Sequence, residues 1–176
     1  MIARVKDYLM ALQDSICQAL EEIDGVASFS NEEIINSQKG FARPRVIDDG
    51  AYIERGAVLF SYSVGDALPA AASKRNPALA GMGFEAVAVS VITHPRNPYA
   101  PTFHANLRFF QVNHEHWHFG GGFDLTPFYP YKEDVIHWHR KAKAACDPFG
   151  AELYPMFKTS CDEYFYLSHR QEPRGV

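Results

Sequence analysis

The segment 102–110 constrains the fold of this chain most strongly, because its side chains alternate in character with a period of two. Side chains of a β-strand point alternately to the two faces of its sheet, so this spacing predicts a strand with two different faces. One face carries apolar residues, namely Phe103, Ala105, Leu107 and Phe109. The other face carries Thr102, His104, Asn106, Arg108 and Phe110.

Two interpretations of the second face stay open. A strand face turned to solvent is the simpler one, but such faces usually carry Lys, Glu and Thr. Here His104 and Arg108 bring groups that exchange protons and bind planar anions. The face is therefore also a candidate binding or catalytic surface.

Segments before this strand predict the rest of a sheet. Residues 48–50 (Asp-Asp-Gly) lie between two short apolar segments and are typical of a hairpin turn, which leads to the apolar run 57–60. Residues 85–93 are rich in valine and contain no Gly or Pro, as expected for a central strand. A stiff, proline-rich loop follows over 94–101.

Three segments have the spacing of amphipathic helices. The first covers 2–22 and ends near Gly25. The second covers 133–146; its buried stripe leaves out His137 and consists of Val135, His139, Ala142 and Cys146. The third covers about 152–167, with a stripe expected to be buried of Leu153, Phe157, Cys161, Tyr164 and Phe165. A histidine that faces a core, such as His139, is either a structural residue or a ligand.

Length and charge exclude several classes of protein. A chain of 176 residues with 47% hydrophobic residues is expected to form a single domain. The net charge of -4 gives no polycationic surface, so nucleic acid is not an expected partner. No apolar run reaches the roughly 20 residues that span a bilayer, and the first residues lack the layout of a signal peptide. We therefore expect a cytoplasmic protein.

The three cysteines are an odd number without CxxC spacing, which argues against a disulfide framework or a thiolate metal site. We expect all three thiols to be buried. Aromatic residues make up 14% of the chain and concentrate in its second half, either as a core or as a surface for a large flat ligand. The glycine run 120–122 matches no nucleotide-binding loop; it either lets the backbone approach a bulky group or makes a turn.

Alternation also places three histidines, His114, His116 and His118, on one face of a possible strand. Three imidazoles on one face could hold a metal ion. A histidine-ligated metal dioxygenase or hydrolase is therefore a rival hypothesis.

Several short motifs follow one another in a fixed order from Ala57 to the end of the chain. They are Ser90, His94-Pro95-Arg96-Asn97-Pro98, Pro101-Thr102 with His104-Ala105-Asn106-Leu107-Arg108, Trp117-His118-Phe119-Gly120-Gly121-Gly122 with Asp124-Leu125-Thr126-Pro127, Cys146-Asp147-Pro148-Phe149-Gly150, and Cys161-Asp162-Glu163-Tyr164-Phe165-Tyr166-Leu167 with His169-Arg170. This ordered set resembles the oxygen-dependent coproporphyrinogen-III oxidases.

The resemblance implies an α+β fold, with a large antiparallel sheet flanked by helices on both sides, and assembly as a homodimer. It also implies a reaction: coproporphyrinogen III is converted to protoporphyrinogen IX, and the propionates of rings A and B become vinyl groups. Molecular oxygen is the co-substrate, and no organic cofactor is expected.

The resemblance assigns roles to individual residues. His104 corresponds to the proposed proton donor. Substrate binding is expected for Ser90, Asn106, Leu107 and Arg108. A divalent metal cation is possible, with ligands that would be His94, His104, His139 and His169.

The resemblance further implies a strand after Val176 that this sequence lacks. We therefore expect the chain to be the amino-terminal part of the family, truncated at its C-terminus. A second hypothesis follows, in which the chain is an inactive fragment that binds porphyrinogen without converting it.

Overall fold

The computed structural model describes residues 1–31, 34–35, 40–68, 77–113 and 116–173. The chain divides into two compact units. The first consists of Met1–Arg96 and Phe103–Phe123, and the second of Asn97–Thr102 and Asp124–Val176. Each unit is described by itself, and the single domain expected from the chain length stays a prediction.

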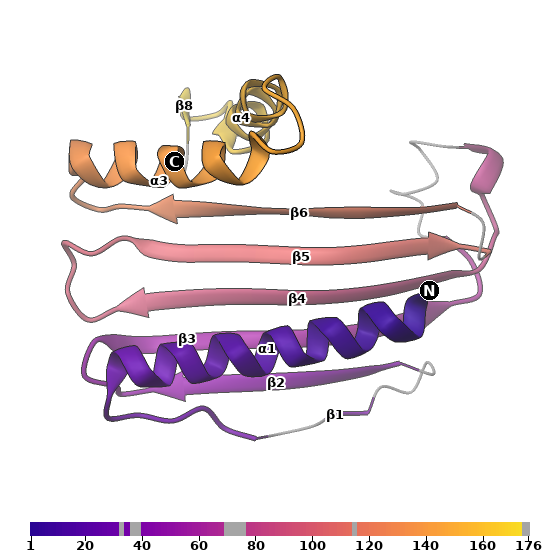
Figure 1. Ribbon diagram of the computed structural model, residues 1–176, viewed down its shortest axis with the longest axis horizontal. Helices are drawn as coiled ribbons and strands as arrows, with labels where there is room; N and C mark the ends of the chain where they lie inside the picture. The colour runs from indigo at the N-terminus through magenta and orange to yellow at the C-terminus, as the bar shows by residue number, and fades with distance from the viewer. Residues whose placement is uncertain (32–33, 36–39, 69–76, 114–115, 174–176) are drawn as a thin grey trace. The chain divides into compact units, whose positions relative to one another are not determined.

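A six-stranded sheet forms the largest element of the chain, and its strands lie side by side in chain order (Figure 1). The strands are β1 (Ile34–Ile35), β2 (Phe41–Asp48), β3 (Ile53–Gly65), β4 (Phe84–Pro95), β5 (Thr102–Val112) and β6 (His116–Thr126). The pairs from β1 to β5 are antiparallel, and β4 is a central strand, as its valine-rich sequence predicts. A short 3₁₀ helix, Pro77–Leu79, precedes β4.

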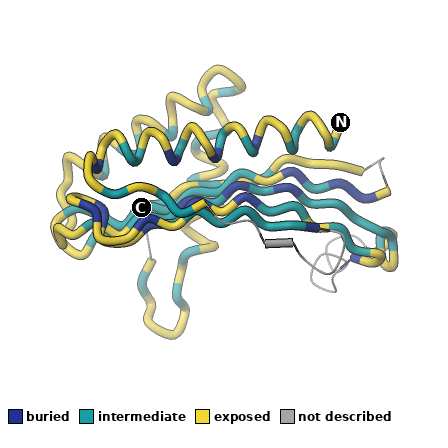
Figure 2. The backbone as a smooth tube through the Cα atoms, turned by 90° about the horizontal axis from the view of Figure 1, so that it is seen from below, coloured by how far each residue is buried: buried dark blue, intermediate teal, exposed yellow. Residues whose placement is uncertain are grey.

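Helix α1 (Ile2–Asp24) covers one face of this sheet, as the spacing of its apolar residues predicts (Figure 2). Leu9 is fully buried against a core that includes Val58, Phe60 and Val87, all with 0% exposure. Burial of each such side chain contributes about 1.5–3 kcal/mol. The helix ends at Gly25, whose φ of 74° is the left-handed conformation that glycine adopts most easily.

The two faces of β5 differ as its alternation predicts. Phe103, Ala105 and Leu107 pack against the core under α1, and Phe109 is completely buried. The opposite face of the sheet is more open, because Val46 and Leu59 on β2 and β3 remain 37% and 39% exposed there. The polar residues of β5 therefore lie on the face that α1 does not cover.

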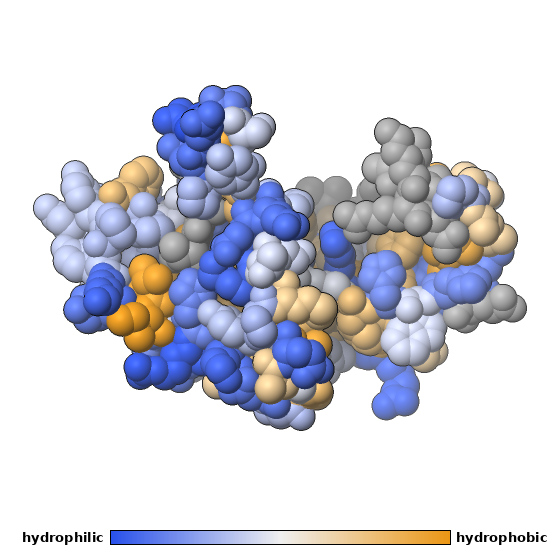
Figure 3. Space-filling model, turned by 90° about the horizontal axis from the view of Figure 1, so that it is seen from above, coloured by the Kyte–Doolittle hydropathy of each residue, from blue (hydrophilic) through white to orange (hydrophobic). Residues whose placement is uncertain are grey.

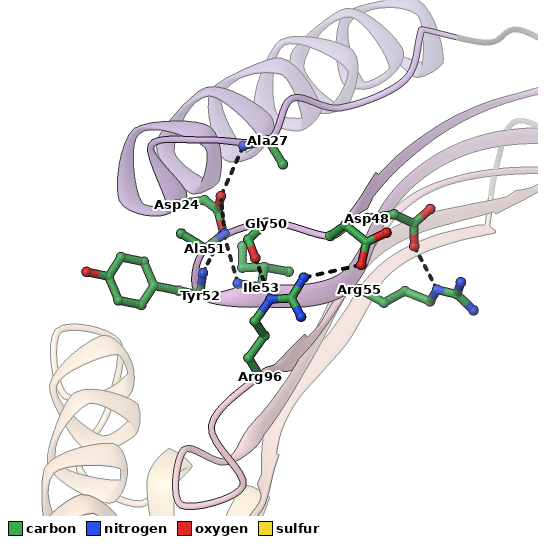
Figure 4. Close-up of polar contacts among 10 residues, drawn as sticks. Asp24, Ala27, Asp48, Gly50, Ala51, Tyr52, Ile53, Arg55 and Arg96 are labelled. Carbon is green, nitrogen blue, oxygen red and sulfur yellow. Dashed lines mark hydrogen bonds and ion pairs between the residues drawn. The ribbon is translucent and has the colours of Figure 1, made fainter.

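The Asp24 carboxylate connects the end of α1 to the turn between β2 and β3 (Figure 4). It accepts hydrogen bonds from the backbone N–H groups of Ala51, Tyr52 and Ile53, each at 2.9 Å. These hydrogen bonds, led by that from Ile53, hold the pKa of Asp24 well below its usual range. A Cβ on Gly50 would collide with this carboxylate, so the Gly of the Asp-Asp-Gly turn is required by the contact.

A second polar contact joins α1 to the sheet. Gln13 is fully buried and donates from Nε2 to the backbone oxygens of Arg43 and Val58, at 2.6 and 2.7 Å. Its Oε1 accepts the Nε–H of Arg43 at 2.6 Å. The amide thus joins α1 to the backbone of both β2 and β3.

The second unit contains α3 (Lys132–Cys146), α4 (Leu153–Tyr164) and a small two-stranded sheet of β7 (Tyr166–Leu167) and β8 (Glu172–Pro173). The stripe predicted for α3 is half-buried and not buried, while His137 is exposed as expected; its members are Val135, His139, Ala142 and Cys146. Hydrophobic and hydrophilic side chains are intermixed on the surface seen in Figure 3.

Two sequence predictions for the last helix are wrong. The helix ends at Tyr164, and β7 follows where the helix was expected to continue. Phe157 and Tyr164 are 49% and 81% exposed, and Cys161 is exposed too, so only Leu153 and Phe165 of the expected stripe are half-buried. No described element of this unit covers that side of α4.

The fold class is α+β, as predicted. Helix α1 supplies a helical layer on one face of the sheet, and the expected layer on the other face stays a prediction. Of the thiols, Cys17 is buried, which raises its pKa to about 11, but Cys146 is half-buried. The expectation of three buried thiols is therefore wrong for Cys146 and Cys161. Among the described helices, none is long and apolar enough to span a membrane.

Candidate active site

The polar residues of β4 and β5 meet on the open face of the sheet. Ser90 lies directly opposite Asn106 in the antiparallel register. Arg108 and His104, two positions away on either side of Asn106, point to the same face. Directly opposite residues have Cβ atoms about 4.5–5.5 Å apart, so the hydroxyl and the amide can bind one ligand group. Ser90 thus lies on the strand paired with β5.

The Arg108 side chain packs over a glycine of the neighbouring strand β6, a contact that the sequence does not predict. A Cβ placed on Gly120 of β6 would lie 3.2 Å from Nε of Arg108 and 3.7 Å from its Cγ. The Arg108 side chain therefore lies over Gly120, and a side chain at position 120 would displace it. Arg108 is exposed, and its guanidinium is a group that binds planar anions.

The glycine run is part of a strand, which excludes the turn that the sequence left open. A Cβ on Gly121 would collide with the backbone oxygen of Asn106, so β6 approaches β5 closely at this point. Nothing lies within 4 Å of the position of a Cβ on Gly122. The run therefore places three residues without side chains on the strand next to the polar residues of β5.

Leu107 differs from the other predicted substrate-binding residues. Its side chain packs against the core under α1, on the opposite face from Asn106 and Arg108. Contact between Leu107 and a ligand on the polar face would therefore use its backbone.

His94 and His104 lie on this same open face. His104 is opposite Ile92, and His94 follows Ile92 by two residues, which makes the two histidines diagonal neighbours on adjacent strands. Such neighbours are about 7–8 Å apart, within reach of a shared ligand. His94 is exposed and His104 half-buried.

The other two histidines of the predicted metal set belong to the second unit. Nδ1 of His139 lies 3.1 Å from the Tyr154 hydroxyl, and the two rings meet edge to face. Burial, with a smaller effect of Lys158, lowers the pKa of His139 and favours the neutral imidazole, which is the form that binds metals. His169 is exposed in the turn between β7 and β8.

The four imidazoles have suitable chemistry for a divalent cation, but the structure does not test them as a set. Within each unit the described residues contain no group of three or more His, Cys, Asp or Glu that could hold a metal ion. His94 and His104 belong to one unit, and His139 and His169 to the other. The metal site therefore stays a prediction.

The rival set of three histidines is only partly described. His114 lies outside the described residues, while His116 and His118 are exposed on β6. The His118 ring packs beside Phe110, with 5.6 Å between the ring centroids.

A family model described as coproporphyrinogen III oxidase matches residues 4–176. The match contains the open face with Ser90, His104, Asn106 and Arg108, and also the helices and turn that carry His139 and His169. It supports a role in porphyrin biosynthesis, with coproporphyrinogen III as the substrate that the family implies. This chain belongs to the coproporphyrinogen III oxidase family.

Proposed function

We propose that the chain catalyses the oxygen-dependent oxidative decarboxylation of coproporphyrinogen III to protoporphyrinogen IX, and that the open face of β4 and β5 binds the reacting propionate. Family membership supports the substrate class. The observation that carries the site proposal is the clustering of a hydroxyl, an amide, a guanidinium and an imidazole on one sheet face, opposite to the face that α1 covers.

Arg108 is proposed to bind the propionate carboxylate. A guanidinium forms two parallel, charge-assisted hydrogen bonds with a carboxylate, and Arg108 lies exposed over Gly120. Ser90 and Asn106 lie beside it and can fix the orientation of the same group. The glycine run of β6 adds no side chains next to them, and the space beside Gly122 is open, which leaves room for a broad macrocycle.

His104 is proposed to supply a proton. For each propionate, the side chain CH2–CH2–COO⁻ becomes CH=CH2 and CO2 and loses one proton and two electrons. These pass to O2, and one further proton completes H2O2. A histidine can deliver that proton near neutral pH. His104 is half-buried on the same face as Arg108, where a bound propionate would lie.

Three further features belong to the proposal. No organic cofactor takes part. In a metal-bound form, a divalent cation would be held by His94, His104, His139 and His169 and would supply Lewis acidity, and His104 would then be a ligand in place of a proton donor. We also propose a cytoplasmic homodimer, which sedimentation of the purified chain would test.

The test is the oxygen requirement of the reaction. Purified chain is incubated with coproporphyrinogen III in air and under argon, and vinyl product, CO2 and H2O2 are measured, with a chelator-treated sample in parallel. Vinyl product in air alone, with equal amounts of CO2 and H2O2, supports the proposal. Product of equal yield under argon would contradict the oxygen dependence. Binding of coproporphyrinogen III without product would favour the inactive-fragment hypothesis.

A further inference from the structure

The second unit contains a pocket that the proposed reaction does not use. Its volume is about 400 Å³, within the range of small-molecule sites. The proline-rich loop before β5, the end of β6 and the first turns of α3 line it. The lining side chains that matter here are Tyr99, Tyr131, Asp134, His137 and Trp138.

The aromatic wall of the pocket is preformed. The Tyr99 ring stacks on Tyr129, with 4.7 Å between centroids and an interplanar angle of 29°, and lies 6.4 Å from the Tyr131 ring. The loop below it is fixed as well, because the Tyr99 N–H donates to Oδ1 of Asn97 and the Ala100 N–H donates to the Asn97 backbone oxygen, both at 3.0 Å. Little conformational entropy would therefore be lost when a ligand binds.

The pocket lining contains a carboxylate and no Lys or Arg. The carboxylate belongs to Asp134, in the first turn of α3. In the described part of the chain, Asp134 forms no ion pair. The faces of the tyrosine and tryptophan rings also carry negative potential. A carboxylate among aromatic faces attracts a cation.

We propose that this pocket binds a small organic cation of the quaternary alkylammonium class. A metal ion is a poor occupant, because the pocket offers too few ligating side chains for one. Quaternary ammonium groups keep their charge while exposing methyl groups, and aromatic walls bind both features at once. The lining residues belong to the second unit, whereas the decarboxylation is assigned to residues of the first unit.

Choline is the probe that tests the proposal. The full chain is titrated at pH 8 and constant ionic strength, and the indole N–H signal of Trp138 is followed by NMR. The comparison ligand is 3,3-dimethylbutan-1-ol, which has the same shape but a carbon atom in place of the charged nitrogen. We expect saturable choline binding and affinity for the alcohol lower by about tenfold. Equal affinities, or no saturable shift with choline, would overturn the proposal.

A matched pair of variants locates the charge. Asp134→Asn should weaken choline binding about three- to tenfold, because it removes the carboxylate without changing its shape. Glu133→Gln removes the same charge from the same turn of α3 but does not line the pocket, so choline affinity should stay unchanged. Equal loss of choline affinity in both variants would show only long-range attraction and would contradict binding of choline in this pocket.

The comparison of choline with its neutral analogue decides the proposal even where a variant fails to fold, because it uses the unaltered chain. Circular dichroism identifies such a variant. The titration requires no turnover, so failure of the decarboxylation proposal and failure of this one are distinguished.

Discussion

Ser90 and Asn106 lie opposite each other across β4 and β5, on the face of the sheet that α1 leaves open. The pair is flanked along β5 by His104 on one side and Arg108 on the other. Arg108 and His104 are four residues, or about 13 Å, apart along β5, and the Ser90–Asn106 pair lies between them. The predictions below follow from this arrangement and from the contacts that hold the sheet in shape.

Replacing Arg108 with Lys should raise the KM for coproporphyrinogen III by about tenfold or more. Lysine keeps the positive charge but loses the paired donors that fit a carboxylate, and hydrogen bonds to charged groups contribute about 1.5–3 kcal/mol. Steady-state kinetics measure the change. Arg140→Lys, exposed on α3, is the control and should leave KM unchanged. An unaltered KM in the Arg108 variant would remove this residue from the site.

Gly120→Ala should displace the Arg108 side chain. The added methyl group would lie 3.2 Å from Nε of Arg108, closer than most Cβ contacts, so the guanidinium has to move. NMR of the Arg108 Nε–H group detects the displacement directly, and KM should rise with it. Gly122→Ala adds the same methyl group to the same strand in open space and should leave that NMR signal in place. Equal changes of the Arg108 NMR signal in the two variants would contradict the packing of Arg108 over Gly120.

Asp24→Asn should lower the melting temperature by roughly 5 °C or more. The asparagine replaces a carboxylate that accepts several backbone N–H groups, and its NH2 group would face donors. Because folding lowers the pKa of Asp24, its contribution is complete above the ordinary aspartate pKa of about 3.9 and is lost as the pH falls below that value.

Thermal melts of the wild type and of Asp24→Asn between pH 7 and pH 2 test whether the contribution of Asp24 is lost at low pH. The difference between the two proteins should be constant above about pH 5 and shrink below pH 4. Asp48→Asn, which alters an exposed ion pair with Arg55, should melt close to the wild type at neutral pH. A difference that grows as the pH falls would contradict the account.

Gln13→Leu should destabilise the fold by about 2–3 kcal/mol, because the backbone oxygens of Arg43 and Val58 lose their buried donor. Urea unfolding gives the free energy. Gln18→Leu makes the same change on the exposed side of α1, where only the contact with Glu22 is lost, and should cost less than about 0.5 kcal/mol. Similar losses in both would show that the buried amide has no special role.

Much of the first unit could be predicted from local spacing. The alternation in β5 and the helical spacing in α1 report which side of each element is buried, and Gly25 marks the helix end. The contacts of Asp24 and Gln13 could not be predicted, because their partners lie 27 to 45 residues away along the chain. Nothing in the local sequence identifies such a partner.

The last helix shows the limit of periodicity. The spacing of Phe157, Cys161 and Tyr164 identifies an apolar side of α4, but burial depends on whether another element covers it, which spacing does not encode. The position of Arg108 over Gly120 cannot be predicted from the sequence for a similar reason. The glycine run was visible, yet pairing Gly120 with Arg108 requires the register of two strands.

The most direct test of the central claim is the rate of vinyl product formation by His104→Ala in air, beside His116→Ala. Both changes remove one imidazole, but His116 is exposed on β6 and outside the proposed site. The account predicts that His104→Ala remains folded and loses about 100-fold or more in rate, the contribution typical of a general acid, while His116→Ala stays close to the wild type. Wild-type turnover by folded His104→Ala would contradict it.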